Sequence, residues 1–303
     1  MPDFPVLVKI LAVFILVVAA SSRKVHLGLA ALAGGWAFAF WQGLSLDNIA
    51  RLSVLEILEA ENILLLLLVT LIMVLSAAMR KAGAMEDFAR SVRAVASSRN
   101  ASLILTPVLI GTLPMPGGAA FSAPLVDSLD PDRCLGPDRL SAANYWFRHS
   151  LEVWWPLFPS FILTATLTGF EVSRLVFLNF YMFPAMVVLG WLFLLRKSSG
   201  PAAPLPASMG HRAGFLQVIY GFAPLIIVLG IYAVLDTALR AAGPALGIPP
   251  DASGLTTRFL PILSGICAGM LFIAAKNRGR GVWRGSLTLA TLKLAGVVAG
   301  IRI

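Results

Sequence analysis

The sequence predicts an all-α polytopic membrane protein. Of its 303 residues, 58% are hydrophobic and only 13% are charged, and the mean hydropathy is +0.85. Soluble domains carry about 25% charged residues. Several apolar runs also reach the roughly 20 residues that a helix needs to cross a bilayer. A soluble globular domain is therefore excluded as the fold class.

Apolar runs and the charged loops between them place the expected helices. A broken apolar segment occupies 101–129, and we expect spans at 4–20, 25–43, 61–79, 146–168, 174–195, 214–236, 259–275 and 286–303. Pro201, Pro204 and Pro206 make 196–213 a linker. We expect this cytoplasmic linker to divide a first repeat, 1–195, from a second, 214–303.

The broken segment contains TLPMPGGAAFSAP, residues 112–124. Pro114 and Pro116 end an incoming half-helix, and Gly117 and Gly118 permit a sharp reversal of the chain. A non-helical backbone at membrane depth is tolerated only where protein buries it or where it lines a water-filled cavity. We therefore expect a re-entrant helical hairpin that faces a binding site.

The positions of the basic residues support this hairpin. If 101–129 enters and leaves on one side, nearly all loop Lys and Arg lie on that side, and the opposite loops hold only Arg51, Arg174, Arg240 and Arg258. The positive-inside rule then places the N-terminus outside the inner cell membrane. The net charge of +9 is explained by cytoplasmic loops facing anionic lipid, so nucleic acid is not expected as a partner.

The two half-helix ends predict complementary ion sites. The free amides from Gly118 onward carry partial positive charge that suits an anion, and Ser122 adds a hydroxyl one turn later. The carbonyl oxygens near Thr112 suit a cation such as Na⁺. The alternative is a proline-kinked helix that packs closely through small residues.

The stretch NYWFRHSLEVWWPLFPS, residues 144–160, supplies ionisable groups. At helical spacing, Asn144, Arg148 and Glu152 share one face, with His149 beside it. We expect Arg148 to neutralise a substrate carboxylate or phosphate, and Glu152 or His149 to carry a coupling proton. The alternative is an interfacial anchor with an Arg–Glu pair and a tryptophan belt.

The order of spans resembles an inverted-topology repeat, with 61–79 corresponding to 286–303. Secondary transporters often build a midplane site from such repeats. The second repeat stops where its own hairpin would begin, so we expect the natural chain to continue past Ile303. The two cysteines match no metal spacing, and no cofactor is expected other than a coupling Na⁺ or H⁺.

TLPMPGGAAFSAPLVD together with NYWFRHSLEVWWPLFPSFIL resembles an uncharacterised membrane family, domain of unknown function family 401. That family is similar to the ion transporter superfamily of gluconate, citrate and dicarboxylate permeases. The resemblance implies a carrier with paired hairpins, often dimeric and coupled to Na⁺ or H⁺. It also implies that the hairpin residues line the substrate site, namely Pro114, Pro116, Gly117, Gly118 and Ser122.

We therefore expect a secondary transporter, or a fragment of one, for a small organic anion, with lipid and the anion as partners and a homodimer as its assembly. The main alternative is a non-transporting assembly or scaffold protein. An intramembrane enzyme with Ser122 as nucleophile and His149 as base is a further alternative, although no G-x-S-x-G, H-E-x-x-H or Walker motif is present. The expectation is therefore a protein that is not an enzyme.

Overall fold

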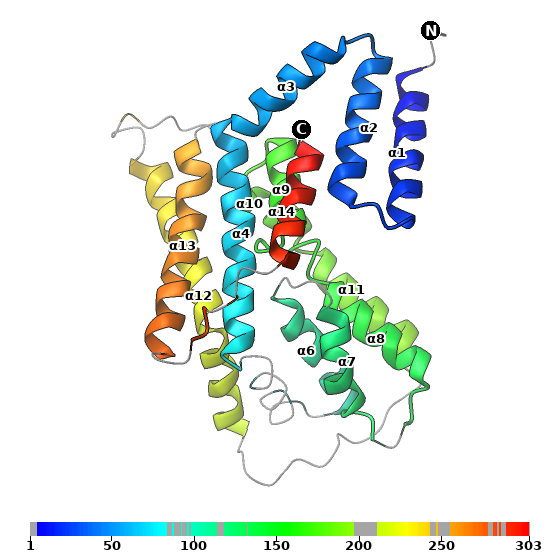
Figure 1. Ribbon diagram of the computed structural model, residues 1–303. Coiled ribbons are helices and arrows are strands. Elements are labelled where there is room, and N and C mark those ends of the chain that lie inside the picture. Colours follow the sequence, from blue (N-terminus) through cyan, green and yellow to red (C-terminus); the bar gives the residue numbers. More distant parts are fainter. Residues whose placement is uncertain are drawn as a thin grey trace. The chain divides into compact units, whose positions relative to one another are not determined.

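The computed structural model describes residues 5–83, 87, 92, 96, 98–113, 118–131, 133–196, 211–242, 247, 255–277, 281–283, 285 and 289–302. Within these residues every element of regular secondary structure is a helix, as expected (Figure 1). The chain divides into two compact units, Met1–Leu71 with Leu287–Ile303, and Ile72–Ser286. The dividing point falls inside helix α4, Ala60–Lys81.

The first unit is built on helix α2, Leu27–Trp41, which packs against α1, Val6–Ser22, and α14, Leu289–Arg302. The contact between α2 and α14 depends on glycine. A Cβ added to Gly28 would lie well under 3.0 Å from the carbonyl oxygen of Gly296, and one added to Gly300 would meet the carbonyl of Gly28 in the same way. Small residues permit such close backbone approach between membrane helices.

Helix α3, Leu46–Leu58, occupies part of the expected loop between the second and third spans. The hydroxyl of Ser45 caps it by accepting a hydrogen bond from the Asn48 amide. The helix is amphipathic but too short and too polar for a span, because Asp47, Arg51 and Glu56 interrupt its apolar residues. Long apolar runs, from which the spans were predicted, give no sign of this helix, because charged residues interrupt its apolar positions.

The second unit contains the C-terminal part of α4 and the site-forming helices α6, Arg99–Gly111, α7, Gly118–Asp127, and α8, Pro137–His149. The chain continues through α9, α10, α11 and the π-helical turn η1, which are Pro159–Thr168, Val172–Asn179, Met182–Gly190 and Trp191–Leu195. Helices α12 and α13, which close the unit, are His211–Ala242 and Leu255–Lys276.

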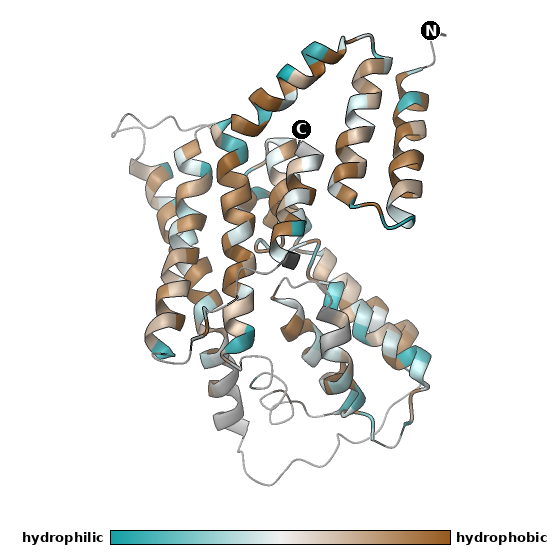
Figure 2. Cartoon of the chain, in the orientation of Figure 1, coloured by the Kyte–Doolittle hydropathy of each residue, from teal (hydrophilic) through white to brown (hydrophobic). Residues whose placement is uncertain are grey.

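Four helical segments are long and apolar enough to cross a membrane: Ala60–Lys81, Val172–Leu195, Ile219–Ala242 and Leu255–Lys276. They coincide with four expected spans, and α1, α2 and the Thr291–Gly300 part of α14 are shorter apolar helices at three others. Figure 2 shows hydrophobic residues along the middle of α4 and hydrophilic ones at its ends. The fold is thus that of a multi-pass membrane protein.

The expected single span 146–168 is wrong. Helix α8 ends at His149, turns follow, and the chain is helical again only in α9. The Ser150 hydroxyl donates to the carbonyl of Phe147 at the end of α8. Pro156 and Pro159 lack the amide that a continuous helix requires, and Pro159 stands at the first position of α9, where that loss costs nothing.

The broken segment is confirmed as two helices, α6 and α7, and Thr112 and Leu113 after α6 are not helical. The first half ends at Gly111, where it was expected, and the second begins at Gly118. The turn residues Pro114, Pro116 and Gly117 lie outside the described residues, as does most of the linker 196–213.

Candidate functional site

The candidate site lies where α6, α7 and α8 meet. A Cβ on Gly111, the last residue of α6, would lie well under 3.0 Å from the backbone carbonyl oxygen of Arg148. The end of α8 therefore contacts the end of α6 backbone to backbone. This contact places Arg148 beside the break between α6 and α7.

Helix α7 is held against α8 through Asn144. The Ser122 hydroxyl donates to Asn144 Oδ1 over 2.7 Å, and Asn144 Nδ2 donates to the Ala119 carbonyl oxygen over 2.8 Å. Ser122 and Asn144 are both buried. The structure thus brings together two predicted site residues, and it shows that the Ser122 hydroxyl already has protein partners.

Helices α7 and α8 run antiparallel. The C-terminal residues Pro124 and Asp127 of α7 share a groove with Pro137 and Leu140 at the start of α8, while Ala119 in the first turn of α7 bonds to Asn144 later in α8. Arg148 lies one helical turn beyond Asn144. It therefore lies beyond Asn144 toward the N-terminal end of α7, where the first amides have no partner within the helix.

The Arg148 side chain is buried with unused donors. Its exposed fraction is 2%, and its Nε and Nη2 make no hydrogen bond with any part of the chain the structure describes. These two nitrogens lie on one edge of the guanidinium, the edge that binds a carboxylate through two parallel hydrogen bonds. Buried guanidinium donors without hydrogen-bond partners cost several kcal/mol, so this edge favours an anionic partner.

Trp155 fixes the end of α6 from the turn that follows α8. Its indole Nε1 donates to the carbonyl oxygen of Thr112 over 3.0 Å, and the Thr112 hydroxyl donates to the Leu109 carbonyl. From the sequence, this tryptophan was expected only as part of an interfacial belt. The carbonyl of Thr112 that was expected to suit a cation is already an acceptor for Trp155, with one lone pair left.

His149 and Glu152 form a pair beside the buried arginine. His149 Nδ1 lies 2.6 Å from Glu152 Oε1, and the Tyr145 ring lies 4.3 Å from the imidazole between centroids. Both members of the pair are partly exposed. Glu152 was expected on the helical face of Asn144 and Arg148, but α8 ends at His149 and Glu152 lies in the turn that follows, where its charge still acts on the Arg148 guanidinium.

The proposed nucleophile and base of an enzyme do not share a hydrogen bond. Ser122 bonds to Asn144 and to the Ala119 carbonyl, whereas His149 bonds to Glu152. Among the described residues, no group of three or more His, Cys, Asp and Glu is placed to hold a metal ion.

The groove between α7 and α8 reaches the site from the loop end. Its volume is about 410 Å³, and it is lined by Ala123, Pro124, Val126, Asp127, Pro137, Leu140, Ser141 and Asn144. Asn144, which lines this groove, lies one helical turn before Arg148, which does not line it.

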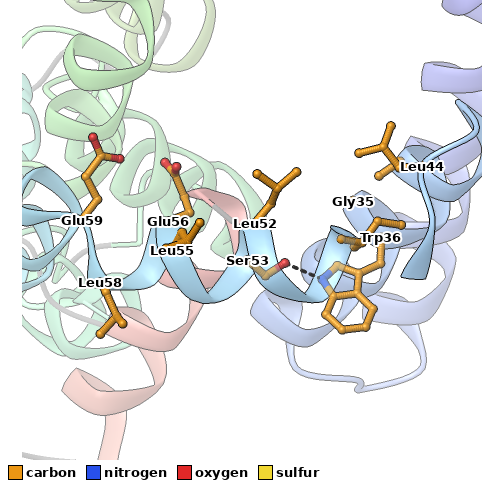
Figure 3. Close-up of a pocket in the computed structure, with 11 residues that line it drawn as sticks. Gly35, Trp36, Leu44, Leu52, Ser53, Leu55, Glu56, Leu58 and Glu59 are labelled. Atoms are coloured by element: carbon orange, nitrogen blue, oxygen red, sulfur yellow. Dashed lines mark hydrogen bonds between the residues drawn. The ribbon is translucent and has the colours of Figure 1, made fainter. Parts of the chain in front are cut away.

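Two further features belong to other helices. In the first unit, α2 and α3 enclose a groove of about 720 Å³, across which Trp36 Nε1 donates to Ser53 Oγ (Figure 3). Its wall is largely apolar, with Glu56 and Glu59 at one end. In the second unit, Arg240 pairs with both Asp236 and Glu171 and so links α12 to the start of α10.

The helices and the site define a multi-pass helical membrane protein with a broken helix pair beside a buried arginine. The model of the DUF401 family, described as a protein of unknown function, matches residues 5–242. The chain belongs to this family. Comparison with curated proteins and with solved structures found no match.

Proposed function

We propose that the protein is a secondary active transporter, or part of one, for a small organic anion of the carboxylate type. The observation that carries this proposal is the buried Arg148 guanidinium, whose Nε and Nη2 have no hydrogen-bond partner in the described chain. A carboxylate bound there accepts two parallel hydrogen bonds and offsets the cost of the buried charge.

The start of α7 adds to this anion site. Helix α7 begins at Gly118, at the end of the α7–α8 pair where Arg148 also lies, and its first amides carry the positive end of the helix dipole. Half-helix N-termini that point at anionic substrate groups are a recurring feature of secondary transporters. An anion between α7 and Arg148 would thus meet two independent positive groups.

The proposed coupling ion is H⁺ or Na⁺. The His149–Glu152 pair follows Arg148 directly in the sequence and remains partly open to solvent, so it is placed to exchange a proton near the bound anion. The end of α6 is the Na⁺ alternative, since the Thr112 carbonyl keeps one acceptor position. In the proposed orientation the N-terminus is outside the inner membrane.

Transport by reconstituted protein tests the proposal. Proteoliposomes are given radiolabelled small carboxylates under an imposed Na⁺ or H⁺ gradient, with protein-free vesicles as the control. We expect saturable, gradient-dependent uptake of at least one carboxylate, recovered chemically unchanged. Unsaturable flux would indicate a channel, a changed substrate would indicate an enzyme, and no uptake of any anion would contradict the proposal.

The scaffold alternative makes a different prediction for the helix break. If the break serves only packing, Pro116→Ala and Gly118→Ala lower expression and no anion binds any variant. If it forms a site, folded Gly118→Ala protein binds the anion more weakly than the wild type, because a Cβ narrows the approach to the α7 amides.

A further inference from the structure

The last residue of α13 lies over an aromatic ring of α12. Lys276 Nζ is 3.8 Å from the centroid of the Tyr220 ring. Helices α12 and α13 run antiparallel in close contact, because Gly265 abuts Val228 and Gly269 abuts the Pro224 carbonyl. Lys276 and Tyr220 therefore mark one end of this helix pair, near the start of the apolar stretch Ile219–Ala242.

An apolar groove runs along α12 on both sides of Tyr220. It has a volume of about 650 Å³ and is lined by Leu216, Ile219, Tyr220, Ala223, Ile226 and Ile227. These residues recur at helical spacing on one face, and the small Ala223 leaves the hollow between the larger side chains. The Tyr220 hydroxyl is the one polar side-chain group in this lining.

The surroundings of the groove identify its occupant. Only 17% of the most apolar stretch within Ile219–Ala242 is buried inside the protein. In a membrane, most of this stretch of α12 would therefore face lipid. An acyl chain is the apolar ligand available there. Lys276, whose ammonium lies over the Tyr220 ring of the groove, is exposed, and Arg278, Arg280 and Arg284 follow it in the sequence. Clustered basic residues at a membrane surface attract anionic headgroups.

We propose that Lys276, Tyr220 and the α12 groove form a binding site for one anionic phospholipid. An acyl chain lies along Ala223 and Ile227, and the headgroup phosphate accepts hydrogen bonds from the Lys276 ammonium. The cation–π contact with Tyr220 positions the ammonium and leaves its N–H donors available. This site is separate from the anion site at Arg148 and does not rest on the proposed transport function.

Lipid retention tests the site directly. The whole chain is reconstituted with equal amounts of phosphatidylglycerol and phosphatidylcholine, re-extracted in detergent, and the bound lipids are counted by native mass spectrometry. We expect about one retained phosphatidylglycerol per chain. Lys276→Gln weakens phosphatidylglycerol binding about fivefold, the effect of removing one cation at a membrane surface, and Lys276→Arg keeps it.

Two matched controls separate this site from general lipid contact. Arg174→Gln removes an exposed cation near the start of α10 that also lies over an aromatic ring, that of Phe170, and leaves retention unchanged. Ala223→Trp fills the groove and lowers retention, whereas Ala185→Trp on an exposed position of α11 does not. Equal retention in Lys276→Gln and Arg174→Gln, no preference for phosphatidylglycerol, or a change in oligomeric state alone in Ala223→Trp would overturn the proposal.

Discussion

The backbone of Arg148 rests on Gly111, with the α8 carbonyl oxygen in the space that a Cβ on Gly111 would occupy. We expect Gly111→Ala to destabilise the protein by about 1–3 kcal/mol, because the added methyl forces apart two helix backbones. Thermal unfolding in detergent measures this change. Gly230→Ala is the matched control, since nothing lies within 4 Å of its Cβ position and alanine favours a helix. Equal effects of the two substitutions would contradict the packing described for α6 and α8.

Asp130 holds the start of α6 to the loop between α7 and α8. Its carboxylate accepts from Arg99 Nη1 over 3.0 Å and from the amides of Cys134 and Leu135, and both side chains of the ion pair are buried. We expect Asp130→Ala to cost about 3–5 kcal/mol, because the substitution leaves a buried arginine without its carboxylate. Chemical unfolding measures the loss, and the exposed Asp127→Ala should change stability by less than about 0.5 kcal/mol. Similar losses in the two variants would show that the buried pair contributes little.

The Ser122 hydroxyl links α7 to α8 through its hydrogen bond to Asn144. We expect Ser122→Ala to lower stability by about 1–3 kcal/mol, since Asn144 Oδ1 loses its donor while still buried. The anion affinity should fall less than it does in Arg148→Lys, because the Ser122 hydroxyl proton is already used within the protein. A double-mutant cycle with Asn144→Ala separates the two contributions. A larger loss of affinity in Ser122→Ala than in Arg148→Lys would place the hydroxyl, not the guanidinium, at the centre of the site.

Glu152→Gln removes a titratable carboxylate and keeps the shape of the side chain. We expect this variant to bind the anion as the wild type does but to lose the pH dependence of uptake in proteoliposomes. Glu171→Gln is the control, because Glu171 is also a paired carboxylate, but its partner is Arg240 of α12 and neither residue belongs to the site. Unchanged pH dependence in Glu152→Gln would remove Glu152 from the coupling mechanism.

The sequence predicted the membrane helices and the broken pair because both are local features. Long apolar runs are recognisable by length, and the prolines and glycines after Gly111 end a helix wherever they occur. The positions of the half-helix ends followed from the same residues. The family resemblance was confirmed over residues 5–242, whereas the link to transporters stays a prediction.

The partners of the site residues could not be predicted in the same way. Helical spacing placed Glu152 on the same helical face as Arg148. In the structure α8 ends at His149, and the Glu152 carboxylate in the following turn pairs with His149 while its charge still acts on Arg148. The Trp155–Thr112 and Ser122–Asn144 hydrogen bonds join residues far apart in the sequence, so only the packing of α6, α7 and α8 reveals them. Likewise, the absence of a hydrogen-bond partner for Arg148 Nε and Nη2 among the described residues depends on every neighbour that the fold places around them.

The most direct test of the account is the thermal stability of wild type, Arg148→Met and Arg148→Lys against a panel of small carboxylates. A ligand at a hundredfold excess over Kd stabilises the state it binds by about 2.7 kcal/mol. We predict that one carboxylate class stabilises the wild type and neither variant. We also predict that Arg148→Met without ligand is about 1–4 kcal/mol more stable than the wild type, because it removes a buried charge whose Nε and Nη2 have no hydrogen-bond partner. Arg174→Met, the exposed control, should respond to the carboxylates as the wild type does. Equal carboxylate responses in the wild type and Arg148→Met, or a less stable ligand-free Arg148→Met, would contradict the central claim that Arg148 is held ready for an anion.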